Sequence, residues 1–393
     1  MNKNEQVNIS IPKRAFDKLY LNNGGKNKIL ARIDHNRIIL QAKETKTEAQ
    51  TQSLRWFMVP GLLAGIVALV NFFIQKTDYV KLSGANSISQ ITIYLAALFG
   101  FITFLIALLL LGRKQLVITS RLAKFRSITT LSIAFTLLDF SLTSYFFYFV
   151  DLAFHGVILD RYTSSALIAG FVGIASYLMM NAAQSIDFST ITTILIFTLV
   201  GGIFFSMINN KHEDWWQINF SYLGSNLSNN WWQFNLTLIF SAMIMLTLID
   251  YIFSLIFQIP QFFNTQMKVL RLLLAATSIV FGLVGAFQNN RSIIWLHELH
   301  WWSANALVIL VLILIIGLKW LLPNATREFL LTAYGFAGLL ALSEILFQTV
   351  HYLSLTAFEI ISFSLSFGLL ILLMQNLNTL YIENAEIFTV EIK

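Results

Sequence analysis

The chain has 393 residues, of which 56% are hydrophobic and 12% are charged, and its mean hydropathy is +0.69. Globular domains that fold in water carry about 25% charged residues, so the composition excludes an ordinary water-soluble protein. The absence of cysteine excludes disulfides, thiolate metal sites and thiol nucleophiles. No Gly-x-x-x-x-Gly-Lys-Ser/Thr motif occurs, so a P-loop ATPase is excluded as well.

The net charge of +6 belongs to the start of the chain. Residues 1–46 hold ten Lys or Arg and four Asp or Glu, whereas the later residues hold sixteen of each kind. We therefore interpret residues 1–46 as a basic head, 47–53 as a polar tether and the remainder as a membrane body.

The head shows the pattern of a small β-structure. Apolar residues alternate with polar ones over 7–11 and again over 29–33, and residues 37–40 return as a further strand. Residues 14–20 suit a short helix, and Asn22-Asn23-Gly24-Gly25 suits a turn. So small a domain buries too little surface to be stable alone, which favours pairing of two chains.

The head resembles the SpoVT/AbrB domain, the swapped-hairpin fold also found in MazE-type antitoxins, over residues 5–43. The resemblance rests on Ile9-Ser10-Ile11-Pro12-Lys13, Leu19, Leu21, Gly24-Gly25, Ile29 to Ile33 and Arg37-Ile38-Ile39-Leu40. It implies a homodimer that shares one small β-barrel, and it implies DNA binding through basic residues.

Six basic residues of the head are the candidates for DNA contact: Lys13, Arg14, Lys26, Lys28, Arg32 and Arg37. Clustered cations give salt-sensitive affinity for DNA phosphates. Two alternatives stay open. These residues either only enforce topology or contact anionic lipid heads, or the head binds a protein partner, as antitoxin relatives do.

The sequence of the membrane body predicts about ten membrane-spanning helices, since each helix needs about 20 apolar residues. We place them at 54–74, 90–112, 127–150, 163–183, 189–208, 235–257, 269–288, 302–322, 328–350 and 357–377. The predicted fold is thus a mainly α polytopic bundle with a small N-terminal swapped-hairpin β-barrel.

Loop charges predict the orientation, because Lys and Arg are retained on the cytoplasmic side. The loop after the second span is the most basic, and the loops before the seventh and ninth spans share its side. Both chain ends therefore belong in the cytoplasm of a bacterial cell, with a cytoplasmic tail at 379–393. The short turn 184–188 has no basic residue and is the weak point of the span count.

The body divides by resemblance into four spans over 54–188 and six over 189–378. The second part resembles a bacterial family of six-span membrane proteins with no established activity. The features that carry this resemblance are Ser221-Tyr222-Leu223-Gly224, Phe234-Asn235, and His300 ahead of Ala304 and Ala306.

Polar residues gather in the predicted outer loops. Loop 209–234 holds four Trp, so we expect it either to lie flat on the membrane or to cap the bundle. A zinc site of an outer-face lipid-modifying enzyme would draw on the pair His297 and His300, spaced as neighbours on a helix. Its further candidates are His212, Glu213, Asp214, His351 and Asp160. The other interpretation is that these histidines lie at the membrane interface and hydrogen-bond lipid heads. Because the sequence contains no known metal or catalytic motif, we expect no metal, no other cofactor and no enzyme activity.

Three carboxylates fall within predicted spans: Asp139, Asp250 and Glu344. Such residues are costly in lipid and often mark ion pathways, so a transporter or permease is one alternative for the whole protein. The other interpretation is a carboxyl that is hydrogen-bonded to a facing Ser, Thr or Asn.

Gly61 and Gly65 form a Gly-x-x-x-Gly motif in the first span, a spacing that lets helices approach closely and would suit a dimer. Together these features predict a membrane-tethered, DNA-binding transcriptional regulator with a sensing or anchoring bundle.

Overall fold

The computed structural model describes residues 58–110, 118, 120–210, 214–323 and 325–384 in full. It describes the backbone alone for 55–57, 9–10, 29–34, 37–42 and 391–392. Two compact units result, Phe57–Ile382 and a smaller one made of Met1–Trp56 with Glu383–Lys393.

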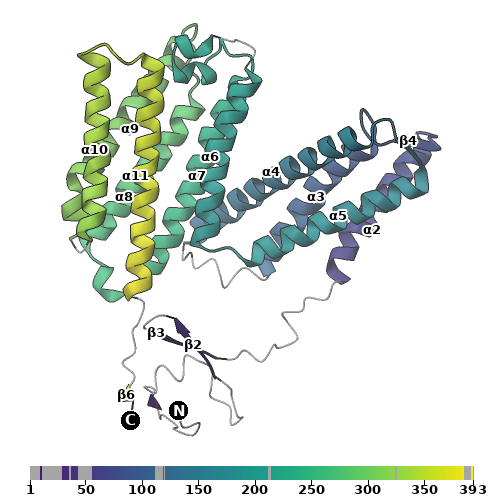
Figure 1. Cartoon of the computed structure of the whole chain (residues 1–393), viewed down its shortest axis with the longest axis horizontal. Helices are drawn as coiled ribbons and strands as arrows, with labels where there is room; N and C mark the ends of the chain where they lie inside the picture. The colour runs from purple at the N-terminus through teal and green to yellow at the C-terminus, as the bar shows by residue number, and fades with distance from the viewer. Residues whose placement is uncertain are drawn as a thin grey trace. The chain divides into compact units, whose positions relative to one another are not determined.

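Where the structure describes the large unit, its main elements are ten α-helices in the order that the sequence predicts (Figure 1). They are α2 Arg55–Ile74, α3 Ile88–Leu110, α4 Arg121–Ala153, α5 Arg161–Gln184, α6 Phe188–Asn209, α7 Trp231–Ile256, α8 Thr265–Ala286, α9 Ile294–Leu321, α10 Arg327–Gln348 and α11 Leu355–Asn384. Among the described residues, nine of these helices are long and apolar enough to cross a membrane. The remaining one, α2, is apolar over Met58–Ile74. The prediction of a multi-pass helical membrane protein is thus confirmed.

Side-chain caps define several helix starts. Asp187 accepts a hydrogen bond from the Thr190 backbone N–H at the start of α6, and Asn264 accepts one from Met267 at the start of α8. Such caps satisfy backbone donors that a helix leaves open at its first turn. Because α5 ends at Gln184 and Asp187 caps the next helix, the turn at 184–188 separates two helices as predicted.

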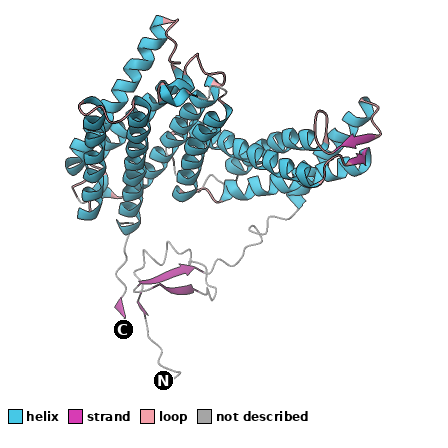
Figure 2. Cartoon of the chain, turned by 45° about the horizontal axis from the view of Figure 1, so that its top comes forward, coloured by secondary structure: helices cyan, strands magenta, loops and turns pink. Residues whose placement is uncertain are grey.

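We call α2–α5 the four-helix region and α6–α11 the six-helix region. In each region, loops that are predicted to lie on the outer side of the membrane meet at one end of the helices. In the four-helix region, β4 (Tyr79–Lys81) pairs antiparallel with β5 (Ile158–Asp160) and joins two predicted outer loops (Figure 2). In the six-helix region, Ser225 bridges to Asn289 and so joins two more.

The Gly-x-x-x-Gly face of α2 packs within the chain. A Cβ on Gly61 would lie 2.6 Å from the Ala169 carbonyl oxygen of α5, and one on Gly65 would lie 2.9 Å from the Ala169 Cβ. The close approach that the motif predicts is therefore real, but its partner is α5 of the same chain. The expectation that this face serves a dimer is corrected.

A single apolar cluster runs through both regions. It includes Phe104 and Leu131 of the four-helix region together with Ile244, Leu248 and Leu270 of the six-helix region. The regions thus share part of their core.

The smaller unit contains two antiparallel pairs. β2 (Ile29–Asp34) pairs with β3 (Arg37–Ala42), and β1 (Ile9–Ser10) pairs with β6 (Glu391–Ile392). The β2–β3 register sets Ile29, Ala31 and Ile33 opposite Ala42, Leu40 and Ile38, so apolar residue types occupy one alternate set of positions.

Candidate functional site

A cavity of about 310 Å³ lies within the six-helix region. Its walls come from α7, α8, α9 and α11, and the short helix η3 (Phe220–Gly224) contributes at one end. The volume is at the lower end of the range of small-molecule sites. We take this cavity as the candidate site.

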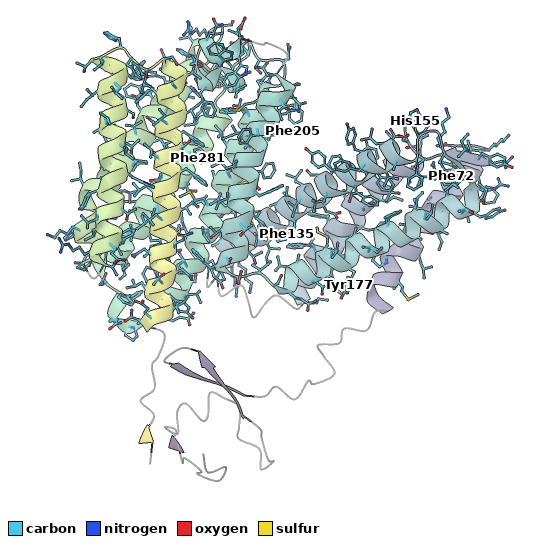
Figure 3. The ribbon with its side chains drawn as sticks, in the orientation of Figure 1. Phe72, Phe135, His155, Tyr177, Phe205 and Phe281 are labelled. Atoms are coloured by element: carbon cyan, nitrogen blue, oxygen red, sulfur yellow. The ribbon has the colours of Figure 1, made fainter. Side chains whose placement is uncertain are left out.

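Aromatic rings form much of the cavity wall. Phe281 of α8, labelled in Figure 3, lies 6.0 Å from Phe363 of α11 between ring centroids. Phe363 is also 5.7 Å from Phe220 of η3, which meets Phe234 of α7 at 5.3 Å. Ring separations of this size are favourable beyond the area they bury, so the rings hold four elements around one apolar space.

Close packing of α7 against α8 fixes one wall. The Ser278 hydroxyl donates to the Ala242 carbonyl at 2.8 Å, and a Cβ on Gly285 would lie 2.7 Å from the Asn235 carbonyl oxygen. Only glycine allows that approach, because any other residue would push the helices apart.

Two ionisable side chains lie at the same end of the cavity. Glu359 of α11 accepts a hydrogen bond from the Phe220 backbone N–H. His300 of α9 has its Nδ1 at 2.8 Å from the Phe287 carbonyl oxygen and 3.1 Å from that of Val284. Carbonyl oxygens only accept, so Nδ1 carries the hydrogen and, in the neutral ring, Nε2 keeps a lone pair. Both residues line the cavity.

The loop 209–234 caps this end. Phe220, Tyr222, Leu223 and Gly224 are buried, which favours the second of the two placements expected for the loop. The Asn235 side chain donates to the Gly224 carbonyl at 3.1 Å. Two of the three sequence features that carry the six-span resemblance are therefore in contact with each other.

The histidines named as candidates for a metal site do not form a metal-binding group among the described residues. His297 Nδ1 is 2.8 Å from the Asn289 side-chain oxygen, while His300 faces α8 carbonyls, and His351 is exposed in the α10–α11 loop. Within the residues that the structure describes, no three His, Cys, Asp or Glu side chains could hold a metal ion. His212 and Glu213 lie outside the described residues.

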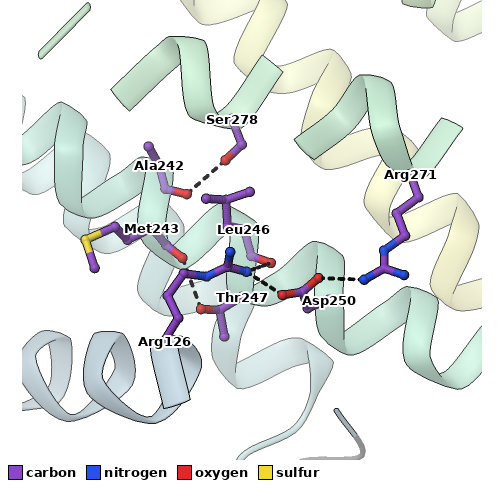
Figure 4. Close-up of polar contacts among 8 residues, drawn as sticks. All are labelled: Arg126, Ala242, Met243, Leu246, Thr247, Asp250, Arg271 and Ser278. Atoms are coloured by element: carbon purple, nitrogen blue, oxygen red, sulfur yellow. Dashed lines mark hydrogen bonds and ion pairs between the residues drawn. The ribbon is translucent and has the colours of Figure 1, made fainter. Parts of the chain in front are cut away.

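Asp250 is part of a charged group at the opposite end of α7. Its carboxylate pairs with Arg126 of α4 and, at 3.1 Å, with Arg271 of α8 (Figure 4). The Arg126 guanidinium also donates to the Leu246 carbonyl at 3.4 Å. In the sequence both arginines count as loop charges, and neither is recognisable as a partner of Asp250. Their long side chains extend along the helices to reach it.

The other two span carboxylates differ in environment. Asp139 of α4 is 9% exposed, and its Oδ2 has no hydrogen-bond partner among the described residues. The oxygen lies beside Gly100 of α3, where an added Cβ would be 3.0 Å away. Glu344 is exposed on α10. The three carboxylates therefore do not form one site.

Four of the DNA-binding candidates, Lys13, Arg14, Lys26 and Lys28, lie outside the described residues. Arg32 occupies a position on β2 opposite Ile39, and Arg37 opens β3 opposite Asp34.

Glu359 is the residue of the site that was missed from the sequence. It lies only two residues inside the predicted tenth span, where a carboxylate resembles an ordinary interfacial charge. Its position beside an aromatic cluster could have been a signal, since Phe358 and Phe363 flank it on the helix.

No protein-family model, curated protein or solved structure matches the chain. The resemblances described for the head and for the six-helix region therefore stay predictions.

Proposed function

We propose that the protein is a membrane-tethered regulator whose six-helix region is a receptor for a lipid-like ligand. The observation that carries the receptor half is the apolar cavity with Glu359 and His300 at one end. Cavities that join a large apolar wall to a few polar groups are typical of sites for amphiphilic small molecules.

The cavity is elongated along the helices. Its lining on α11 runs from Phe358 to Leu370 and on α9 from His300 to Val311. The stretch from Glu359 to Leu370, like that from His300 to Val311, is about 16 Å long at the rise of an α-helix. The two ionisable residues, Glu359 and His300, lie at one end, and the deeper lining is mostly apolar apart from Ser366 and Thr277. This shape suits a ligand with one polar head and one extended chain.

The regulatory half of the proposal concerns the basic head. It is supported by the surplus of positive charge in residues 1–46 and by the antiparallel backbone pairing of β2 with β3. We propose that the head lies in the cytoplasm of a bacterial cell, pairs with a second copy and binds DNA through its Lys and Arg side chains. The positive-inside distribution of loop charges supports the orientation.

A salt titration of DNA binding tests the regulatory half. We expect the full-length protein in lipid nanodiscs to bind duplex DNA with an affinity that falls linearly on a log–log plot against salt. Replacing Arg32 and Arg37 with Gln should reduce the slope by about one for each phosphate that is no longer neutralised. Replacing Lys76 and Lys81 in the predicted outer loop should leave it unchanged. If the unaltered protein shows no DNA binding at low salt, the DNA-binding half of the proposal is wrong.

The proposed homodimer has its own test. The oligomeric mass of the full chain in nanodiscs should be that of two copies and should fall to one copy when residues 1–46 are removed. An unchanged mass would assign any pairing to the membrane body.

A second candidate, a transporter, is favoured by the buried carboxyl of Asp139. A carboxyl oxygen without a hydrogen-bond partner among the described residues is costly inside a helical bundle. Replacing Asp139 with Asn should then abolish uptake of the transported solute while leaving DNA binding intact. For the outer-face metal enzyme, the described residues offer no comparable observation.

A further inference from the structure

We infer that the cavity selects a single-chain amphiphile whose head is a protonated amine. This inference rests on the proposed receptor function and names the chemical class of its ligand. The argument comes from the hydrogen-bonding capacity of the groups that surround the polar end of the cavity.

The polar end offers acceptors and no fixed cation. The Glu359 carboxyl accepts hydrogen bonds from the backbone N–H groups of Phe220 and Ser221, and a carboxylate has about four lone-pair sites, so acceptor capacity remains. Three serine hydroxyls, Ser221, Ser362 and Ser366, also line the cavity. Among the described lining residues none is Lys or Arg. Each serine hydroxyl can donate one hydrogen bond as well as accept, but these described lining residues supply no cation to balance a negatively charged head.

His300 adds a second acceptor. Because the carbonyls of Val284 and Phe287 fix the hydrogen on Nδ1, the Nε2 lone pair of the neutral ring is left for a donor from the ligand. An ammonium head has three N–H donors and stays charged at neutral pH, as the lysine ammonium does. It has enough donors for both Glu359 and His300, which line the same cavity.

An anionic head would meet the opposite situation. A fatty-acid carboxylate or a phosphate would lie beside the Glu359 carboxyl in an apolar surrounding, where like charges repel strongly. A neutral alcohol can donate one hydrogen bond and should bind between the two extremes. The expected order is therefore amine, then alcohol, then carboxylate.

The rest of the cavity fits one chain. The length of about 16 Å along α9 and α11 corresponds to roughly a dozen carbon atoms, given carbon–carbon bonds of about 1.5 Å arranged in a zigzag. The walls there are mostly apolar, with Leu238 and Met245 on α7 and Val311 on α9. Twelve-carbon probes are thus the matched choice.

The test compares radiolabelled dodecylamine, dodecanol and dodecanoate on the full-length protein in nanodiscs, with empty nanodiscs subtracted. We expect saturable binding that is at least about tenfold tighter for the amine than for the carboxylate. Glu359→Gln should weaken amine binding by about tenfold and change alcohol binding by less than about threefold, because the amide oxygen can still accept from Phe220. The control Glu344→Gln, on the exposed face of α10, should change neither.

Two results separate this inference from the receptor proposal. Ala304→Phe places a ring in the cavity and should weaken the binding of all three probes. If the unaltered protein shows no saturable binding at all, the receptor proposal itself is wrong. If the three probes bind equally, or the carboxylate binds best, the inferred head group is wrong while the receptor stands. That rank order is measured on the unaltered chain, so it does not depend on whether a variant folds.

Discussion

The Arg126 guanidinium of α4 is paired with the Asp250 carboxylate of α7, and this ion pair joins the four-helix region to the six-helix region. Arg271 of α8 holds the other oxygen of the same carboxylate. The Asp250 side chain is 11% exposed, whereas those of Arg126 and Arg271 are 34% and 40% exposed. The carboxylate is thus the buried member, and its removal leaves two cations without their shared partner.

Asp250→Asn should therefore destabilise the protein by about 1–3 kcal/mol. This is less than the cost of breaking a fully buried ion pair, because both arginines are partly exposed to solvent. The measurement is the thermal midpoint of the purified protein in detergent. Arg121→Gln, an exposed residue in the first turn of α4, is the matched control and should leave the midpoint unchanged. An equal midpoint for Asp250→Asn would mean that the group contributes nothing.

A double-mutant cycle isolates the contact between the two regions. Arg126→Gln and Asp250→Asn should show a coupling energy of about 0.5–3 kcal/mol, the range for residues in direct contact. Additive effects would show that the two side chains act independently.

The helices could be predicted from the sequence because each needs a long apolar stretch, and hydropathy reports such stretches directly. Their ends could not, since polar and aromatic residues extend helices past the apolar part. Helix α4 begins at Arg121 where the predicted span begins at 127, and α9 begins at Ile294 where it begins at 302.

The candidate site was not predictable in the same way. Glu359 and His300 belong to different helices, and hydropathy gives no information on which faces meet. That both line one cavity depends on the Gly285 contact that closes α7 onto α8 and on the ring contacts of Phe220 and Phe363. The sequence analysis did single out His300 and residues 221–224 as features of the six-span resemblance. It named His300 also as a candidate metal ligand, and it did not predict that these residues line a cavity.

The packing of α2 against α5 predicts opposite effects for two Gly→Ala changes. Gly61→Ala brings a methyl group against the Ala169 backbone and should cost about 1–3 kcal/mol. Gly170→Ala adds a methyl group into open space on α5 and should be neutral or stabilise by up to about 1 kcal/mol, because alanine favours a helix. Thermal midpoints check both. If Gly61→Ala instead lowers only the oligomeric mass, α2 serves a dimer after all.

Asp160, the last residue of β5 and the N-cap of α5, should make the stability of the protein depend on pH in the acid range. Hydrogen bonds from the Thr163 side chain and from the Thr163 and Tyr162 backbone lower the pKa of Asp160, which caps α5. A carboxyl whose folded pKa is lowered adds stability above its unfolded pKa of about 3.9, and that stability is lost as pH falls through the folded value.

Asp160→Asn keeps an acceptor at the cap but does not titrate. The variant should therefore lose less thermal stability than the unaltered protein between neutral pH and about pH 3, whereas the exposed control Glu298→Gln should behave like the unaltered protein. Parallel pH profiles for the unaltered protein and Asp160→Asn would show that the cap charge is irrelevant to stability.

The contact between Gly100 and Asp139 gives the sharpest test of the four-helix core. Gly100→Ala would place a Cβ 3.0 Å from Asp139 Oδ2 and 3.3 Å from Met179 Cγ, and overpacking of this kind costs about 1–3 kcal/mol. Asp139→Ala removes the carboxyl and leaves a space that the new methyl group can partly fill. The double variant should therefore be more stable than the sum of the two single effects predicts, by about 0.5 kcal/mol or more. If the changes in thermal midpoint of the two single variants simply add in the double variant, helix α3 moves away from α4 and the two residues do not share one space.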